Sequence, residues 1–223
     1  MLFKSFLLYS HILCGVLVLL LSIIIMIHQP KGNKTHKTLG WIYFFCMTWI
    51  ACSSLLSMLF FRFYLLLFAI AIFTFHLVYS GVSAIRIKRT RKIKKQDFLV
   101  AWLTLGFGLI LVASAIYWLI NKQTGLAILS GVFGCFIAWS GVGDLLIYKK
   151  IHQQKPMWWW FHHMRGMLGS YIAAFTAFLV QNSEHLSAGP YILLVWFGPG
   201  VIGGFGIAWW SKYYRNKFKN VAN

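Results

Sequence analysis

The residues of this sequence best suited to chemistry are a few histidines and one aspartate inside otherwise apolar stretches. His76 is followed at +4 and +7 by Ser80 and Ser83, so three polar side chains share one face of a helix. Asp144 lies in a second apolar stretch, and the segment 162–165 reads His-His-Met-Arg. Imidazoles with a carboxylate can bind zinc or iron, and two facing imidazoles can bind a b-type haem. The same groups can also relay protons.

We therefore predict two overlapping sets of ligands, placed in the cytoplasmic half of a membrane. The predicted metal ligands are Asp144, His76, His162 and His163. The predicted cofactor ligands, for haem b or a divalent metal, are His36, His76 and His163. Adjacent helical residues point about 100° apart, so His162 and His163 are not expected to share one metal alone.

Each candidate also has a purely structural interpretation. A hydrogen bond between helices accounts for His76 equally well. An ion pair with Arg165 or a loop lysine accounts for Asp144, because an unpaired carboxylate inside a membrane is costly. The sequence contains no HExxH, CxxCH, GxGxxG or P-loop pattern, and it assigns no catalytic residue. Cys14, Cys46, Cys52 and Cys135 all fall in apolar runs without metal-ligand spacing, which is typical of packing residues.

Composition predicts that long apolar helices position these side chains. The 223 residues are 60% hydrophobic and only 11% charged. We predict an all-α polytopic transmembrane bundle with a single integral membrane domain over residues 1–223. Its seven spans are expected at about 5–27, 39–60, 63–85, 98–121, 124–148, 161–181 and 190–210. The second and third share 48 residues with one charge, Arg62, so a tight hairpin is expected at Phe61–Phe63.

The distribution of positive charge predicts the topology. The net charge is +18, from 21 Lys and Arg against three acids. Eighteen of the 21 fall in the first loop, in the block Arg86–Lys95, between Lys149 and Arg165, and after residue 210. Positive residues remain on the cytoplasmic side, so we expect the N-terminus outside and the C-terminus inside. This pattern indicates attraction to anionic lipid headgroups rather than to nucleic acid.

Small residues predict where the helices pack closely. Ser130, Gly134 and Ala138 recur every four positions, and Gly169, Ala173 and Ala177 do the same in the following span. The last span contains the segment 196–200, Trp-Phe-Gly-Pro-Gly, which predicts a kink or an unwound turn near mid-membrane. Broken helices of this kind mark substrate sites in some transporters.

Two stretches carry a resemblance to a known family. They are 36–43, HKTLGWIY, and 167–178, MLGSYIAAFTAF, with the later WFGPG turn. They resemble an uncharacterised family of multi-pass bacterial membrane proteins, often from the Bacteroidota. The resemblance implies a topology and a bacterial inner (cytoplasmic) membrane, but no chemistry. More distant likenesses are to cytochrome b561-type haem proteins and to the seven-helix ceramidase and adiponectin-receptor hydrolases, whose last-helix HxxxH is absent here.

Four functions are therefore open from the sequence. The first is binding of haem or a metal ion, for electron transfer with a quinone or another small-molecule ligand. The second is a small-solute or proton-coupled transporter whose path is lined by Asp144 and the WFGPG segment. The third is a zinc-dependent membrane lipid hydrolase, and the fourth is a structural or accessory membrane protein.

Overall fold

The chain folds as a bundle of long α-helices with short connections. The computed structural model describes residues 2–28, 30–185 and 189–222, and no strand occurs among them. The elements are α1 (Leu2–Ile27), α2 (Lys34–Phe60), α3 (Leu65–Thr90), α4 (Lys95–Ile120), α5 (Thr124–Lys149), the 3-10 turn η1 (Ile151–Gln153), α6 (Trp158–Gln181), the 3-10 turn η2 (Gly189–Tyr191) and α7 (Ile192–Ala222). The all-α prediction and the short connection between the second and third helices are confirmed.

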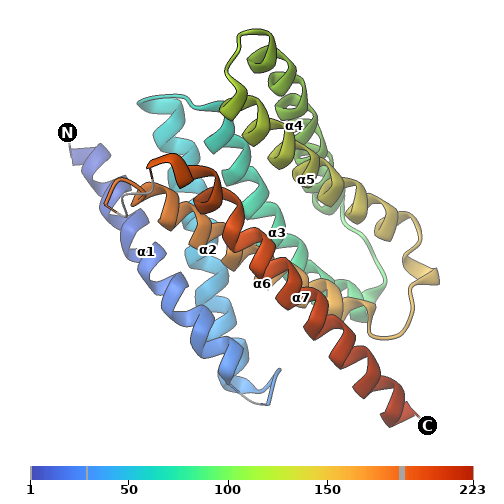
Figure 1. The fold of residues 1–223 in the computed structure, drawn as a ribbon. Helices are drawn as coiled ribbons and strands as arrows, with labels where there is room; N and C mark the ends of the chain where they lie inside the picture. Colours follow the sequence, from blue (N-terminus) through green and yellow to red (C-terminus); the bar gives the residue numbers. More distant parts are fainter. Residues whose placement is uncertain (1, 29, 186–188, 223) are drawn as a thin grey trace.

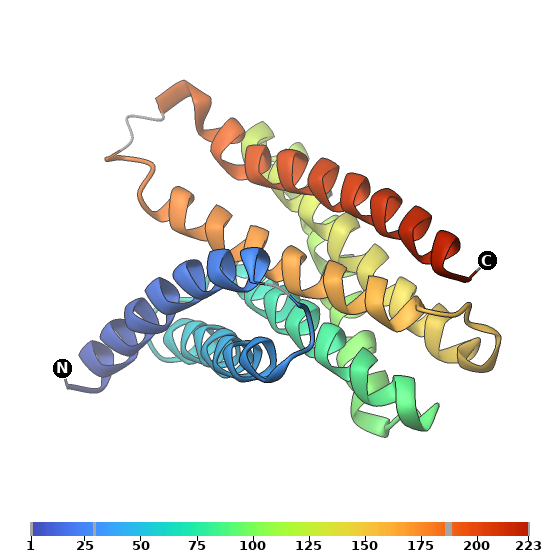
Figure 2. The ribbon, with the colours of Figure 1, turned by 90° about the horizontal axis from the view of Figure 1, so that it is seen from below.

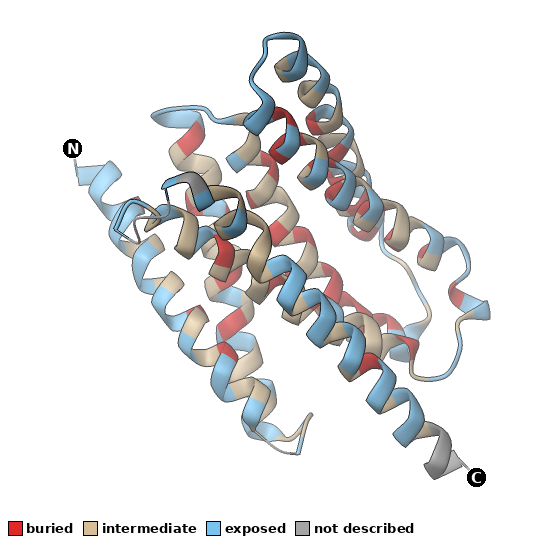
Figure 3. Cartoon of the chain, in the orientation of Figure 1, coloured by how far each residue is buried: buried red, intermediate tan, exposed pale blue. Residues whose placement is uncertain are grey.

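Six of these helices are long and apolar enough to cross a membrane: α1, α2, α3, α4, α5 and α7. The remaining helix, α6, carries His162, His163 and Arg165 in its first half, which lowers its hydropathy. Large apolar side chains cover much of the outer surface; Phe205 is 75% exposed and Trp139 is 77% exposed. Figure 3 shows this exposed shell around a buried centre. A surface of this kind suits lipid, which solvates apolar side chains.

Local interactions determine where several helices begin and end. The backbone N–H of His36 donates to the side chain of Asn33 at 2.8 Å, which caps the start of α2. The ammonium of Lys31 donates to the carbonyls of Ile25, Met26 and His28, satisfying acceptors at the end of α1. Both interactions lie in the short polar connection between α1 and α2, so α2 turns back along α1 within a few residues (Figure 2).

The basic segments gather at one end of the bundle. Figure 1 shows the α1–α2, α3–α4 and α5–α6 connections and the C-terminus toward one end, with the N-terminus and the α2–α3 and α4–α5 connections toward the other. Contacts among the loops and helix ends stabilise the basic end. Arg91 donates to the carbonyl of Ile151 at 2.8 Å, and the Lys88 ammonium lies 3.6 Å from the centre of the Trp159 ring.

Helix α3 has many buried residues and packs against α2, against α6 and against the α4–α5 hairpin. On one side α6 approaches closely, because a Cβ added to Gly166 would lie 2.6 Å from the carbonyl oxygen of Leu77. On the other side lies a tight α4–α5 hairpin, in which a Cβ added to Gly134 would lie 2.7 Å from the backbone nitrogen of Val112. Figure 1 shows the α4–α5 hairpin set to one side of the other helices. The prediction that Gly134 and Ala138 mediate a helix contact is confirmed.

The final helix is not interrupted at its proline. Pro199 lies inside α7, which is helical from Ile192 to Ala222, so the prediction of an unwound turn is wrong. The following Gly203 packs against Ile172 of α6 with no room for a Cβ. Gly203 therefore permits close contact between α6 and α7, whereas nothing lies within 4 Å of a Cβ added to Gly198 or Gly200.

Candidate functional site

Three helices bring polar side chains together inside the bundle. From α3 come His76 and Ser80, which are 1% and 4% exposed. From α5 comes Asp144, which is 3% exposed. From α6 comes His162, whose side chain is 19% exposed and reaches the same place. We call His76, Ser80, Asp144 and His162 the buried cluster. The predicted convergence of His76, Asp144 and His162 is therefore present in the structure, and the prediction that Ser80 and Ser83 face inward is confirmed.

The carboxylate of Asp144 is the centre of the buried cluster. The Ser80 hydroxyl donates to its Oδ2 at 2.6 Å, and the Tyr148 hydroxyl donates to the same atom at 3.2 Å. His162 Nε2 lies 3.1 Å from Oδ1 and 2.7 Å from the Ser80 oxygen. Since the one hydroxyl proton of Ser80 goes to Asp144, the His162 Nε2 must carry a proton and donate it. The alternative in which Asp144 pairs with Arg165 or a loop lysine is wrong, because histidines supply its partners.

His76 completes the buried cluster from the other side. Its Nε2 lies 3.0 Å from the hydroxyl of Ser140 and 3.7 Å from Asp144 Oδ2. Its Nδ1 is buried and has no hydrogen-bond partner within the described chain. The predicted hydrogen bond between helices is confirmed. The Nε2 of His76 lies beside the carboxylate and its Nδ1 has no partner, so the ring can take up a proton next to Asp144.

A small cavity adjoins the buried cluster. Its volume is about 230 Å³, and its walls include His76, Ser80, Asp144, His162 and Arg165. It lies where α5 and α6 have almost no direct contact with each other, although each packs on a different neighbour. The cavity therefore lies at the boundary between the α4–α5 hairpin and the helices gathered around α6.

The geometry of the buried cluster differs from that of a serine hydrolase. In a Ser-His-Asp triad, the serine and the carboxylate bind opposite nitrogens of the imidazole. Here Ser80 and Asp144 both lie against the Nε2 of His162. Within the described residues, no three His, Cys, Asp or Glu side chains are grouped so that they could hold one metal ion. What the arrangement can do directly is bind and exchange protons among a carboxylate and two imidazoles.

His163 faces a different part of the bundle from His162. Its Nδ1 lies 2.8 Å from the carbonyl oxygen of Gly81, and because that oxygen only accepts, the Nδ1 is the donor. Its ring lies 6.5 Å from the ring of His36 on α2, at an angle of 71°. The structure thus separates His36 and His163 from the buried cluster. The expected divergence of His162 and His163 on their helix accounts for this separation.

A second buried acid was missed by sequence reasoning. Asp97, in the first turn of α4, is fully buried and accepts two hydrogen bonds from Arg86 at 2.6 and 2.7 Å. It also accepts from Tyr79 and from the backbone N–H of Lys94. The predicted span 98–121 begins one residue after Asp97, so the prediction placed Asp97 outside the membrane. Asp144 was then the only acid expected within a span. The sequence did contain a signal for this role. Asp97 is the third residue of the helix that follows the basic loop, a position where an acidic side chain commonly caps the helix start.

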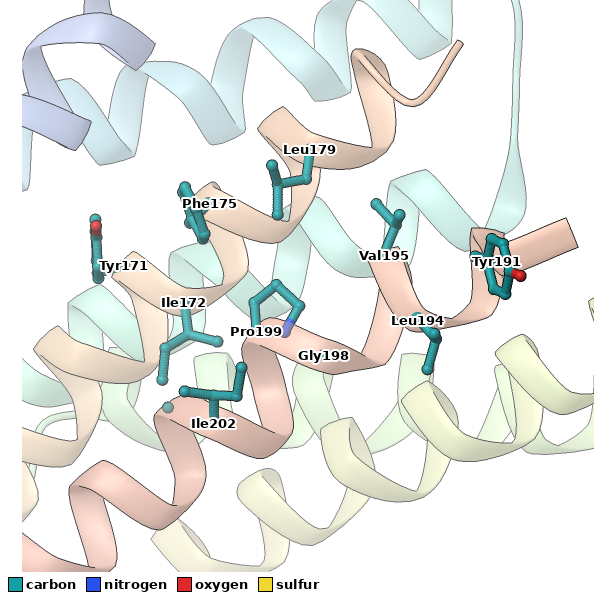
Figure 4. Close-up of a pocket in the computed structure, with 11 residues that line it drawn as sticks. Tyr171, Ile172, Phe175, Leu179, Tyr191, Leu194, Val195, Gly198, Pro199 and Ile202 are labelled. Atoms are coloured by element: carbon teal, nitrogen blue, oxygen red, sulfur yellow. The ribbon is translucent and has the colours of Figure 1, made fainter. Parts of the chain in front are cut away.

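A larger hollow lies elsewhere, between α6 and α7. It has a volume of about 620 Å³ and an almost wholly apolar wall that includes Ile172, Phe175 and Pro199. Figure 4 shows these side chains between the two helices, with Gly198 and Pro199 on α7 opposite α6. Asp144 is not part of its wall. The hypothesis that the WFGPG segment and Asp144 line one path is therefore not supported, because they border two different hollows.

Comparison with known proteins adds no further information about the site. No family model, curated protein or solved structure matches the chain.

Proposed function

We propose that this chain is a multi-pass membrane transporter that couples the movement of a small solute to a proton held by Asp144, His76 and His162. The observation that carries the proposal is a carboxylate, 3% exposed, that contacts imidazoles from two other helices at the edge of a cavity. Ionisable groups inside membrane helices are costly and are typical of ion pathways and proton relays.

The helix arrangement supports coupling to a conformational change. Because α4 and α5 pack tightly on each other and meet the other helices mainly through α3, we infer that the hairpin moves as a unit that pivots on α3. The buried cluster bridges this boundary: Asp144 belongs to the hairpin, whereas His76 and His162 do not. Proton binding changes the net charge of the buried cluster. It therefore changes the free-energy difference between the positions that the hairpin can take relative to the other helices.

The proposed topology has seven crossings, with α6 as the additional one, in a bacterial inner membrane. The basic loops and the C-terminus face the cytoplasm, where they contact anionic headgroups, and the N-terminus faces outward. The arrangement of connections in Figure 1 supports this alternation. By this topology the cavity opens toward the cytoplasmic side, since Asp144 lies five residues, about 7.5 Å, from Lys149 at the end of α5.

Transport is tested with purified protein in liposomes containing a pH-sensitive dye. Sugars, amino acids, organic acids and inorganic ions are added in turn under an inward proton gradient. We expect at least one class to accelerate internal acidification above the rate of protein-free liposomes. No acceleration by any class, with protein shown to be folded and inserted, would contradict the proposal.

A second candidate function is favoured by one observation at His36 and His163. Two imidazoles on a single ion have ring centres roughly 6 Å apart for metal–nitrogen bonds near 2 Å, and the observed separation is 6.5 Å. His36 Nδ1 is buried without a partner, and His163 is oriented through its other nitrogen by Gly81. Haem or metal binding at this pair predicts a Soret band or stoichiometric metal in the purified protein. Absence of both would remove this candidate.

A further inference from the structure

Arg165 is a cation beside the cavity without a carboxylate of its own. It borders the same cavity as Asp144. The chain has three acids, and the other two are unsuited as partners: Asp97 is held by Arg86, and Glu184 lies beyond the far end of α6. Among the described residues no ion pair or hydrogen bond engages the Arg165 side chain. Its charge is therefore available to something that the chain does not provide.

Arg165 is exposed on α6 and also borders the cavity. It lies seven residues beyond Trp158, the first residue of α6, or about 10 Å along the helix. Arginine at such a depth normally faces water, a counter-ion or a headgroup. Arg215 on α7 adds a second positive charge close enough to repel it, and its guanidinium lies 5.7 Å from the centre of the Phe161 ring, one turn before Arg165. Two arginines without a carboxylate partner in this region attract an anion.

A buried hydroxyl lies at the same level. Ser211 on α7 is 1% exposed, and its Oγ has no hydrogen-bond partner within the described chain. Because α6 and α7 run antiparallel and Arg215 lies at Phe161, Ser211, one turn earlier, is level with Arg165. Ser211 is not among the residues that line the cavity, so its hydroxyl supplies no contact to an anion bound there.

The cavity limits the size of the anion. Its volume of about 230 Å³ is below the roughly 300–1,000 Å³ of pockets for drug-sized ligands, which indicates a solute of few heavy atoms. Apolar side chains of Leu77 and Ile147 form part of the wall. A short aliphatic body with one charged end fits this combination of an arginine, serines and apolar side chains.

We propose that the solute is a small monocarboxylate, whose carboxylate binds Arg165 while the proton is held by Asp144 and its histidines. This inference rests on the proposed transport function and names its substrate class. One carboxylate and one proton together carry no net charge. Moving them as a pair across the membrane therefore avoids the cost of transferring an isolated charge through a medium of low dielectric constant.

The inference is tested by binding, which needs no proton movement. Purified protein in a neutral detergent is titrated with sodium acetate, L-lactate or pyruvate against sodium chloride at equal ionic strength. Tryptophan fluorescence reports binding, because Trp139 borders the cavity. We expect saturation by at least one of these anions in the wild type. Loss of charge-assisted hydrogen bonds in Arg165→Gln should raise Kd at least about tenfold, whereas Ser211→Ala, outside the cavity wall, should leave Kd unchanged.

The matched control is Arg62→Gln, which removes an arginine at the opposite end of the bundle, where it stacks on Tyr64 at 4.9 Å. Its Kd should equal that of the wild type. If Arg165→Gln does not fold, Arg165→Lys takes its place, since lysine keeps the charge but loses the bidentate geometry and should still weaken binding. An unchanged Kd in that variant would overturn the inference.

Two other results would also overturn it. The first is the absence of saturable binding by all three carboxylates, or equal binding by wild type and Arg165→Gln. The second is Arg165-dependent retention of phosphatidylglycerol in nanodiscs without carboxylate binding, which would assign the arginine to a lipid headgroup. Failure of transport alone leaves binding intact, so the two proposals fail separately.

Discussion

Replacing Asp144 by asparagine changes charge with almost no change in shape. The wild-type carboxylate accepts hydrogen bonds from Ser80 and Tyr148 and lies 3.1 Å from His162 Nε2. The amide retains one oxygen acceptor, so the side chain still fits between α3, α5 and α6. What is lost is the negative charge that stabilises a proton on His162 or His76.

The size of the effect follows from these contacts. A hydrogen bond to a charged group contributes about 1.5–3 kcal/mol, against about 0.5–1.5 kcal/mol for a neutral one. Losing the charged contact with His162 should lower the proton affinity of the cluster by about 1–2 kcal/mol, or roughly five- to thirtyfold. Solute-driven proton uptake into liposomes should fall by a similar factor. Stability should change less, because the cost of burying a charge disappears with the charge.

The matched control is Asp97→Asn. Asp97 is also fully buried and holds Arg86 at 2.6 Å, but it is outside the wall of the cavity. This variant should lose stability, because a partly buried arginine loses its partner, and the surviving folded protein should transport protons at the wild-type rate. Equal transport by Asp144→Asn and wild type, or equal loss in both variants, would refute the reasoning.

Further predictions concern the neighbours of Asp144. His162→Asn should reduce proton uptake about as strongly as Asp144→Asn, whereas His163→Asn should leave the uptake unchanged, since only His162 reaches the carboxylate; the reverse order of effects would contradict the assignment. Gly166→Ala should lower the midpoint of thermal unfolding, because its Cβ would lie 2.6 Å from a backbone oxygen, and overpacking costs about 1–3 kcal/mol. Gly106→Ala, where nothing lies within 4 Å, should be neutral; equal unfolding temperatures would show that α3 and α6 are not in tight contact.

The helical architecture could be predicted from the sequence because the signals are local and repeated. Apolar runs bounded by charged loops specify helices, and Arg62 between two such runs specifies the tight α2–α3 connection. Periodic small residues such as Gly134 also indicated a real contact. Of the two alternatives predicted at residues 196–200, a kink or an unwound turn, the unwound turn is wrong, because α7 remains helical through Pro199.

The membership of the site could be predicted only in part. His76, Asp144 and His162 were candidates because ionisable groups are rare inside apolar helices. Their partners could not be derived, since the separation of His162 from His163 depends on the rotation of α6 about its axis. Helix rotation is determined by packing, here the close approach of Gly166 to α3, and single-sequence periodicity does not specify it.

The ion pair of Asp97 with Arg86 shows the opposite difficulty. The two residues are 11 positions apart, on either side of a dense block of positive charge. In the sequence that block looks like a uniformly solvated loop. In the structure, one acid turns inward, caps α4 and selects one arginine from seven basic neighbours. Which arginine pairs with Asp97 depends on how the chain turns between α3 and α4, and composition does not specify that turn.

The most direct test of the central claim is an infrared difference spectrum of the purified protein between acidic and neutral pH. If the charged Asp144 stabilises a proton on His162 or His76, the acid-minus-neutral spectrum contains imidazolium ring bands that weaken in Asp144→Asn and remain in Asp97→Asn. A spectrum in which Asp144→Asn is indistinguishable from the wild type would contradict proton exchange at this site.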